Sequence, residues 1–196
     1  MVNKCPIGIW KFTDRAIRNM KRLTSKTNIT GLEYGAVLEG DIIESKERIG
    51  ILELGSECLG SECDIKNMRK ASPDKYFGGE FHTHPNTEEI TPSTSDLLRF
   101  DTLRLDILGN IMCIGNKEHK IKCFTHTYDA LEPERIKTRK RLLEEIDKNT
   151  DLIRLKYVGN VKDIIKKDYT VFGPNDCKLS KKVAHEIEDK LYVKMR

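Results

Sequence analysis

Apolar residues recur along this chain with two different periods, which divide it into strand-like and helix-like segments. Alternating or continuous apolar runs predict strands at Ile7–Phe12, Leu32–Leu38, Arg48–Leu54, Tyr76–His84, Ile107–Ile114 and Lys120–Thr127. Apolar residues three or four apart predict helices at Thr94–Leu105, Pro133–Lys148, Asn160–Lys167 and Ser180–Met195. A further helix begins after the capping pair Thr13-Asp14, with an apolar face of Ala16, Ile17, Met20 and Leu23.

The order of these segments predicts an α/β fold with a mixed central β-sheet flanked by helices. Turns are expected at Glu39–Asp41 and at Gly115-Asn116, and residues 55–75 form a polar, cysteine-containing connection. After Tyr128 the pattern becomes mainly helical. We therefore expect one domain over residues 1–130 and a mainly helical, basic C-terminal extension over residues 131–196.

Composition describes a soluble protein, with 38% hydrophobic and 34% charged residues. No run approaches the ~20 apolar residues that span a bilayer, and Lys4 and Lys11 interrupt the N-terminal segment, so it does not resemble a signal peptide. Six scattered cysteines favour free thiols in a reducing compartment, and the cytoplasm is the expected location. Cys58 and Cys63 are close enough for a disulfide or a metal clip, but neither is favoured.

Positive charge is concentrated in the extension, where residues 131–196 hold 17 Lys and Arg against 12 Asp and Glu. Such a segment could contact nucleic acid or an acidic protein. The alternative, solvated helix faces with both signs interspersed, is favoured, because no aromatic-rich basic patch supports stacking on bases.

Potential metal ligands cluster in the run from Glu80 to Asp96. On a strand, His82 and His84 point to the same face, and Pro85 ends that strand. Asp96 could complete a three-ligand zinc site that leaves a fourth position open for water. Taken separately, the histidines could be surface residues or a hydrogen-bonding pair in the core, and Ser93 and Asp96 could be a helix capping box. Glu80 could orient a histidine ring or simply be exposed.

This run resembles the motif of the JAMM family of zinc metallopeptidases, also called MPN+ or JAB, in its prokaryotic and archaeal form. The motif reads His-x-His-Pro followed by Ser-x-x-Asp, and the family also carries an upstream glutamate on a strand. Here the segment 31–40 resembles that strand, with Glu33 at the glutamate position. Eleven residues separate His84 from Asp96, one more than the commonest family spacing, and the extra residue falls in 86–91. The resemblance covers roughly residues 5–128 and implies a JAMM/MPN-like fold, related to that of cytidine deaminases.

The resemblance implies hydrolysis of a peptide or isopeptide bond at the C-terminus of a ubiquitin-like or small modifier protein. In that reading His82, His84 and Asp96 bind Zn²⁺, Glu33 is the general base, and Ser93 donates a hydrogen bond to the oxyanion. Two alternatives stay open: a nucleic-acid-associated protein resembling the RadC branch, and a non-catalytic MPN scaffold. The retained ligand set argues against the scaffold. The sequence does not identify the modifier or the oligomeric state.

Overall fold

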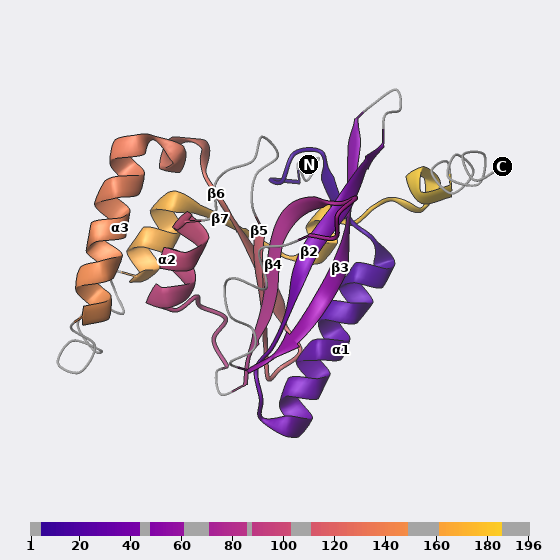
Figure 1. Cartoon of the computed structure of the whole chain (residues 1–196), viewed down its shortest axis with the longest axis horizontal. Coiled ribbons are helices and arrows are strands. Elements are labelled where there is room, and N and C mark those ends of the chain that lie inside the picture. The colour runs from indigo at the N-terminus through magenta and orange to yellow at the C-terminus, as the bar shows by residue number, and fades with distance from the viewer. Residues whose placement is uncertain are drawn as a thin grey trace.

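A seven-stranded mixed sheet forms the centre of the molecule, with helices on both sides (Figure 1). The structure is a computed structural model that describes residues 5–43, 48–60, 71–85, 88–102, 111–148 and 161–185. The strands lie in the order β1-β3-β2-β4-β5-β6-β7. Their bounds are β1 Trp10–Phe12, β2 Tyr34–Ile43, β3 Ile49–Leu59, β4 Tyr76–His84, β5 Ile111–Asn116, β6 Ile121–His126 and β7 Tyr169–Phe172. The predicted α/β class with a mixed central sheet is confirmed.

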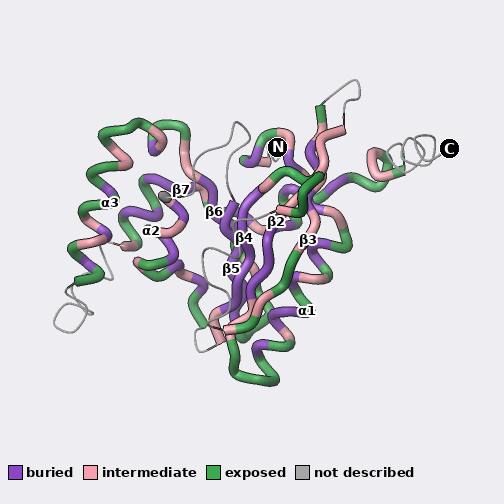
Figure 2. Tube along the Cα trace, viewed as in Figure 1, coloured by how far each residue is buried: buried purple, intermediate pink, exposed green. Residues whose placement is uncertain are grey.

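Two apolar clusters, one on each face of the sheet, form the core. Along β5, Ile111 and Cys113 belong to one cluster, whereas Met112 and Ile114 belong to the other, as the two-residue period of a strand requires. Helix α1 (Asp14–Thr30) covers the first face, and α2 (Thr94–Thr102) and α3 (Pro133–Lys148) cover the second. Figure 2 shows the buried residues concentrated in the strands and on the sides of the helices that face them. Among the described residues, no helix has the length and apolar character needed to cross a bilayer.

The first helix starts and stops where its capping residues predict. The Thr13 side chain accepts a hydrogen bond from the Ala16 N–H at 2.9 Å. At the other end Gly31 has φ +69°, and its N–H donates to the Thr27 carbonyl, which closes the last turn. The helices predicted to begin at Thr94 and Pro133 also begin there.

The predicted turn at Glu39–Asp41 is wrong. Residues Glu39, Gly40 and Asp41 continue β2 and pair with β3. A Cβ on Gly40 would lie 2.0 Å from the Ile51 carbonyl oxygen and 2.8 Å from the Trp10 ring, so glycine is needed there for close packing. The turn predicted at Gly115-Asn116 is present with a small shift: both residues end β5, and the His119 N–H donates to the Asn116 carbonyl at 3.0 Å, so the turn into β6 starts at Asn116.

Other strand limits also shift. Residues 6–9 form a turn, so β1 begins at Trp10 rather than Ile7. Strand β3 runs on to Leu59, into the segment expected to be a polar connection. The parts of predicted elements at residues 103–105, 107–110, 160 and 186–195, and residues 61–70 of the 55–75 connection, lie outside the described residues.

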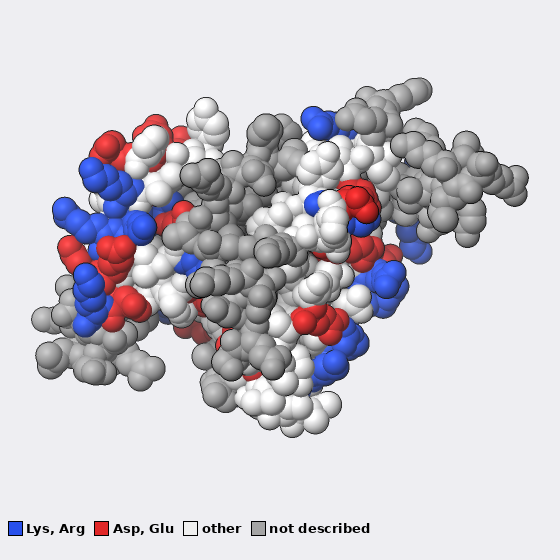
Figure 3. All heavy atoms as spheres, viewed as in Figure 1, with Lys and Arg blue, Asp and Glu red and all other residues white. Residues whose placement is uncertain are grey.

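The C-terminal extension contributes to the same sheet and core as the preceding residues. Besides α3, it forms a helical segment over 161–168, strand β7 and a helical segment over 181–185. Strand β7 pairs with β6 as the last strand of the sheet. The guanidinium of Arg139 on α3 donates two hydrogen bonds to the Asp101 carboxylate on α2, at 2.7 and 2.9 Å. Charges of both signs alternate over α3 at the surface, as Figure 3 shows.

The expectation of free thiols is wrong. Disulfides join Cys5 to Cys177 and Cys113 to Cys123, and Cys58 is also disulfide-bonded. Spacing along the sequence did not reveal these pairs, because strand register brings Cys113 opposite Cys123, and a bridge from Phe12 to Lys178 brings the segments that carry Cys5 and Cys177 together. Cys63 lies outside the described residues. Disulfides are rare in most reducing cytosols, so the cysteine argument for the cytoplasm no longer holds, and that location stays a prediction.

Candidate metal centre

The two histidines lie at the C-terminal end of β4, on the face covered by α2. Residues 81 and 83 point to the other face, where Phe81 joins the α1 cluster and Thr83 contacts Thr27 of α1. His82 and His84 therefore share the α2 face, as their spacing predicted. Their Nε2 atoms are 3.2 Å apart. A single ion could contact both.

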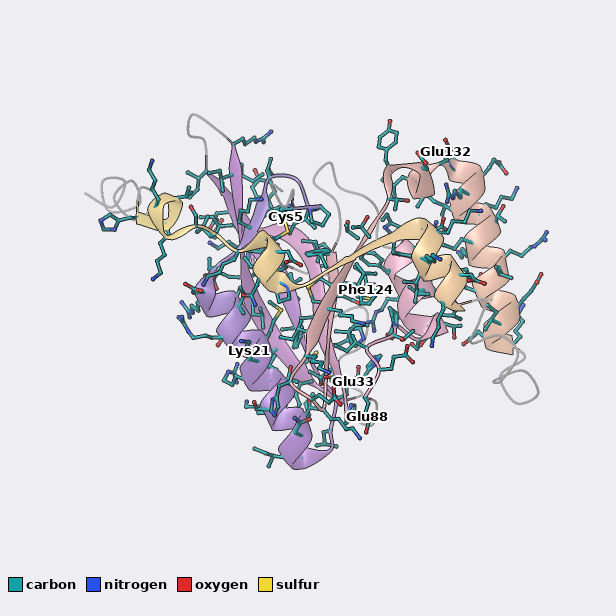
Figure 4. All side chains as sticks on the ribbon, turned by 180° about the vertical axis from the view of Figure 1, so that it is seen from behind. Cys5, Lys21, Glu33, Glu88, Phe124 and Glu132 are labelled. Atoms are coloured by element: carbon teal, nitrogen blue, oxygen red, sulfur yellow. A yellow bond between two sulfur atoms is a disulfide. The ribbon has the colours of Figure 1, made fainter. Side chains whose placement is uncertain are left out.

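Strand β2 brings Glu33 to the same place. Gly35 pairs with His82 across the antiparallel strands β2 and β4, and the same register continued by two residues sets Glu33 level with His84. Glu33, His82 and His84 each offer a ligand atom, and these three atoms lie within 4.8 Å of one another. Figure 4 shows Glu33, which immediately precedes β2, at the end of the sheet and close to Glu88.

Thr83 fixes the chain beside Glu33. Its hydroxyl accepts a hydrogen bond from the Tyr34 N–H at 2.9 Å and contacts the Thr27 hydroxyl at 2.5 Å. Thr83 itself is fully buried between the strand and α1. Helix α1 and strand β4 thus hold the start of β2, and with it the backbone of the candidate base.

Ser93 and Asp96 form a capping box at the N-terminus of α2. The Ser93 hydroxyl accepts from the Asp96 N–H at 3.1 Å, and the Asp96 carboxylate accepts from the Ser93 N–H at 2.8 Å. The Ser93 hydroxyl also lies 2.7 Å from that carboxylate, to which it donates. The capping role considered from the sequence is therefore present, and it orients Asp96. The oxyanion role of Ser93 stays a prediction.

The Asp96 carboxylate faces both imidazoles. Its Oδ1 lies 3.4 Å from Nε2 of His82, and its Oδ2 lies 3.4 Å from Nε2 of His84. Tetrahedral zinc with bonds of about 2.0–2.1 Å has ligand-to-ligand distances of about 3.3 Å. The distances among these three side chains match that value. Glu33 also offers a ligand atom within 4.8 Å of both imidazoles.

Burial and charge act against each other in this cluster. Burial lowers the pKa of the His82 imidazole, but the charge and hydrogen bond of Asp96, aided by Glu80, outweigh it and leave that pKa raised. Burial raises the pKa of the Asp96 carboxyl, but His82, His84 and Ser93 hold it well below its usual range. Asp96 is therefore ionised at neutral pH, as a metal ligand must be. The His84 side chain is 18% exposed against 1% for His82, so the cluster opens to solvent on the His84 side.

The sequence did not reveal Arg99, which contacts this cluster from α2. Its Nη2 lies 2.6 Å from Glu80 Oε1, 3.3 Å from His82 Nδ1 and 3.4 Å from Asp96 Oδ1. Glu80 is buried and paired with this guanidinium, not exposed. The available signal was the three-residue spacing from Asp96 to Arg99, which places both on one helix face.

Two imidazoles and carboxylates are donors that zinc accepts, so the residues present fit that ion. The group of Glu33, His82 and His84 could hold a metal ion, and Asp96 lies against both imidazoles.

No protein-family model matches this chain, and no curated protein matches it either.

Proposed function

We propose that the protein is a zinc-dependent peptidase or isopeptidase of the JAMM type, with His82, His84 and Asp96 as the metal ligands. The observation that carries the proposal is the set of distances of 3.2–3.4 Å among the two imidazoles and one carboxylate, with a further carboxylate, Glu33, beside them. The order of these residues in the sequence, and their resemblance to the JAMM motif, support the same reading.

When bound, zinc would supply a Lewis acid that polarises the scissile carbonyl and lowers the pKa of a water molecule. Glu33 then accepts a proton from the attacking water and passes it to the leaving amine. The Ser93 hydroxyl, which is exposed at the helix N-terminus, turns from Asp96 to donate to the developing oxyanion. Asp96 stays fixed meanwhile through the backbone N–H of Ser93.

We propose as substrate the C-terminal tail of a ubiquitin-like or small modifier protein. The exposure of His84 leaves one side of the cluster open to a chain from another molecule. Support for this substrate class comes from the resemblance to the JAMM family.

The test is hydrolysis of modifier conjugates by the purified protein. Lysine-linked and linear fusions of candidate modifiers are incubated with wild-type protein, with protein treated with a chelator, and with treated protein resupplied with zinc. We expect cleavage at the modifier C-terminus, loss with chelator and recovery with zinc. Cleavage that survives complete metal removal would contradict the proposal.

A further inference from the structure

Glu80 and Arg99 form a buried ion pair directly behind the metal-site residues. Glu80 lies two residues before His82 on β4, and Arg99 lies three residues after Asp96 on α2, so both face the cluster. The Arg99 Nε and Nη2 atoms both donate to Glu80 Oε1, at 3.0 and 2.6 Å. Glu80 is only 2% exposed and Arg99 13%. A carboxylate buried this far requires such a partner.

The same guanidinium contacts two of the proposed zinc ligands. Nη2 of Arg99 lies 3.3 Å from His82 Nδ1 and 3.4 Å from Asp96 Oδ1. Because Nε2 of His82 faces His84 and Asp96, Nδ1 is the ring nitrogen that the metal does not use. That nitrogen faces Arg99 and Glu80, which lie on the side of the ring away from the opening.

A histidine that binds zinc through Nε2 carries its proton on Nδ1 and donates it to an acceptor, commonly a carboxylate. Glu80 Oε1 is such a carboxylate, at 3.9 Å from His82 Nδ1. That separation is too long for a hydrogen bond, and a movement on the order of 1 Å would make one. At present Nη2 of Arg99 lies nearer to Nδ1 than Glu80 does. Because both would then be hydrogen-bond donors, Nη2 cannot stay against a protonated Nδ1. Asp96 Oδ1, 3.4 Å away, is the acceptor that Nη2 can use instead.

We propose that Glu80 and Arg99 are positioning residues of the metal centre. On zinc binding Glu80 accepts the Nδ1 proton of His82, and Arg99 keeps Glu80 and Asp96 in place at the same time. This inference rests on the metal site of the proposed function, but not on the reaction catalysed there. Neither residue touches the substrate.

The test measures zinc affinity of wild type and Glu80→Gln by competition with a chromogenic chelator. The substitution keeps the size of the side chain and removes its charge. We expect zinc affinity to fall by about 10–100-fold, the usual effect of losing the partner of a metal-binding histidine. In ¹H–¹⁵N spectra of zinc-loaded wild type, the His82 Nδ1–H should be visible and protected from exchange, and the substitution should shift it.

Asp101→Asn is the matched control, because it disrupts another buried carboxylate–guanidinium pair on α2, with Arg139. If the role of Glu80 were purely structural, the two variants would lose similar stability and similar zinc affinity. We expect the control to lose stability and to change zinc affinity by less than about threefold. Equal loss of zinc affinity in both variants, or unchanged affinity in Glu80→Gln, would overturn the inference.

Arg99→Lys provides a second variant if Glu80→Gln does not fold. Lysine keeps the positive charge but cannot hold two acceptors with a planar fork, so zinc affinity should again fall, and unchanged affinity overturns the inference. Wild-type protein that binds no zinc would overturn both this inference and the proposed function. Zinc binding that depends on Glu80, in a protein without hydrolytic activity, would overturn the proposed function alone and support the inference.

Discussion

Gly35 on β2 pairs directly with His82 on β4. Because successive side chains of a strand alternate in direction, this one pairing sets the face on which Glu33 lies and its level along β4. A register shift of one residue would turn Glu33 toward α1 and away from the histidines. The buried residues Ala36 and Leu38, which pack in the α1 cluster, oppose such a shift. The core packing of β2 therefore positions the candidate base.

Glu33→Gln separates metal binding from catalysis. The amide keeps the size of the side chain but cannot accept a proton, so turnover should fall by at least about 10²-fold while zinc stays bound. Zinc content and hydrolysis are measured on the same preparation. Lost zinc would identify Glu33 as a fourth ligand, and full activity would remove it from the mechanism.

Ser93→Ala separates helix capping from oxyanion stabilisation. Losing the cap should lower the free energy of unfolding by roughly 0.5–2 kcal/mol, and losing an oxyanion donor should lower kcat by about 10²–10³-fold. We expect both effects, measured by denaturant unfolding and by hydrolysis.

Thr13→Ala is the matched control for Ser93, since Thr13 caps α1 through a 2.9 Å hydrogen bond from the Ala16 N–H. Thr13→Ala should lower the free energy of unfolding by a similar amount to Ser93→Ala and leave kcat unchanged. If Ser93→Ala behaves like this control, Ser93 is only a cap.

The Asp101 cluster predicts acid sensitivity. Burial raises the pKa of the Asp101 carboxyl, but hydrogen bonds from His126 and Arg139 outweigh it and leave that pKa lowered. A carboxyl with a lowered folded-state pKa contributes stability that is complete above pH about 4 and is lost as the pH falls through the folded pKa. Asp101→Asn should reduce the free energy of unfolding at neutral pH by about 3–5 kcal/mol. The variant should also lose less stability than wild type as the pH falls below 4. Unfolding free energies measured between pH 2 and pH 7 check this, and an unchanged slope would contradict it.

The bond between Cys5 and Cys177 predicts sensitivity to reductant. It closes a loop with a sequence separation of 172 residues, and such cross-links typically contribute about 2–4 kcal/mol by restricting the unfolded chain. Cys5→Ser should lower the thermal midpoint of the oxidised protein, and reductant should then have a smaller further effect. Equal midpoints for the variant and wild type would show that the bond does not stabilise the fold.

Local patterns predicted those parts of the fold that local physics determines. The capping of α1 by Thr13 depends on neighbouring residues, so the sequence revealed it. Gly40 was taken for a turn because its conformational freedom is visible in the sequence, whereas its close contact with Trp10 is not. The pairing of Cys5 with Cys177 likewise depends on how distant segments meet.

The candidate site divides in the same way. Four of its residues lie close together in the sequence, and strand and helix periodicity were enough to predict that they meet: His82, His84, Ser93 and Asp96. Glu33 needed the resemblance to a known motif, because only the register of β2 with β4 places it. The contact of Arg99 with the site was not predicted, because an arginine on a helix is usually solvated and its partner Glu80 lies on another element.

Anomalous X-ray diffraction from crystals of the zinc-loaded protein, collected at the zinc absorption edge, locates the metal. We expect one strong peak at about 2.0–2.1 Å from Nε2 of His82, Nε2 of His84 and one oxygen of Asp96, with Glu33 beside the metal but outside bonding distance. A zinc-soaked crystal with no peak among these side chains, or with the metal held by a different set of residues, would contradict this expectation.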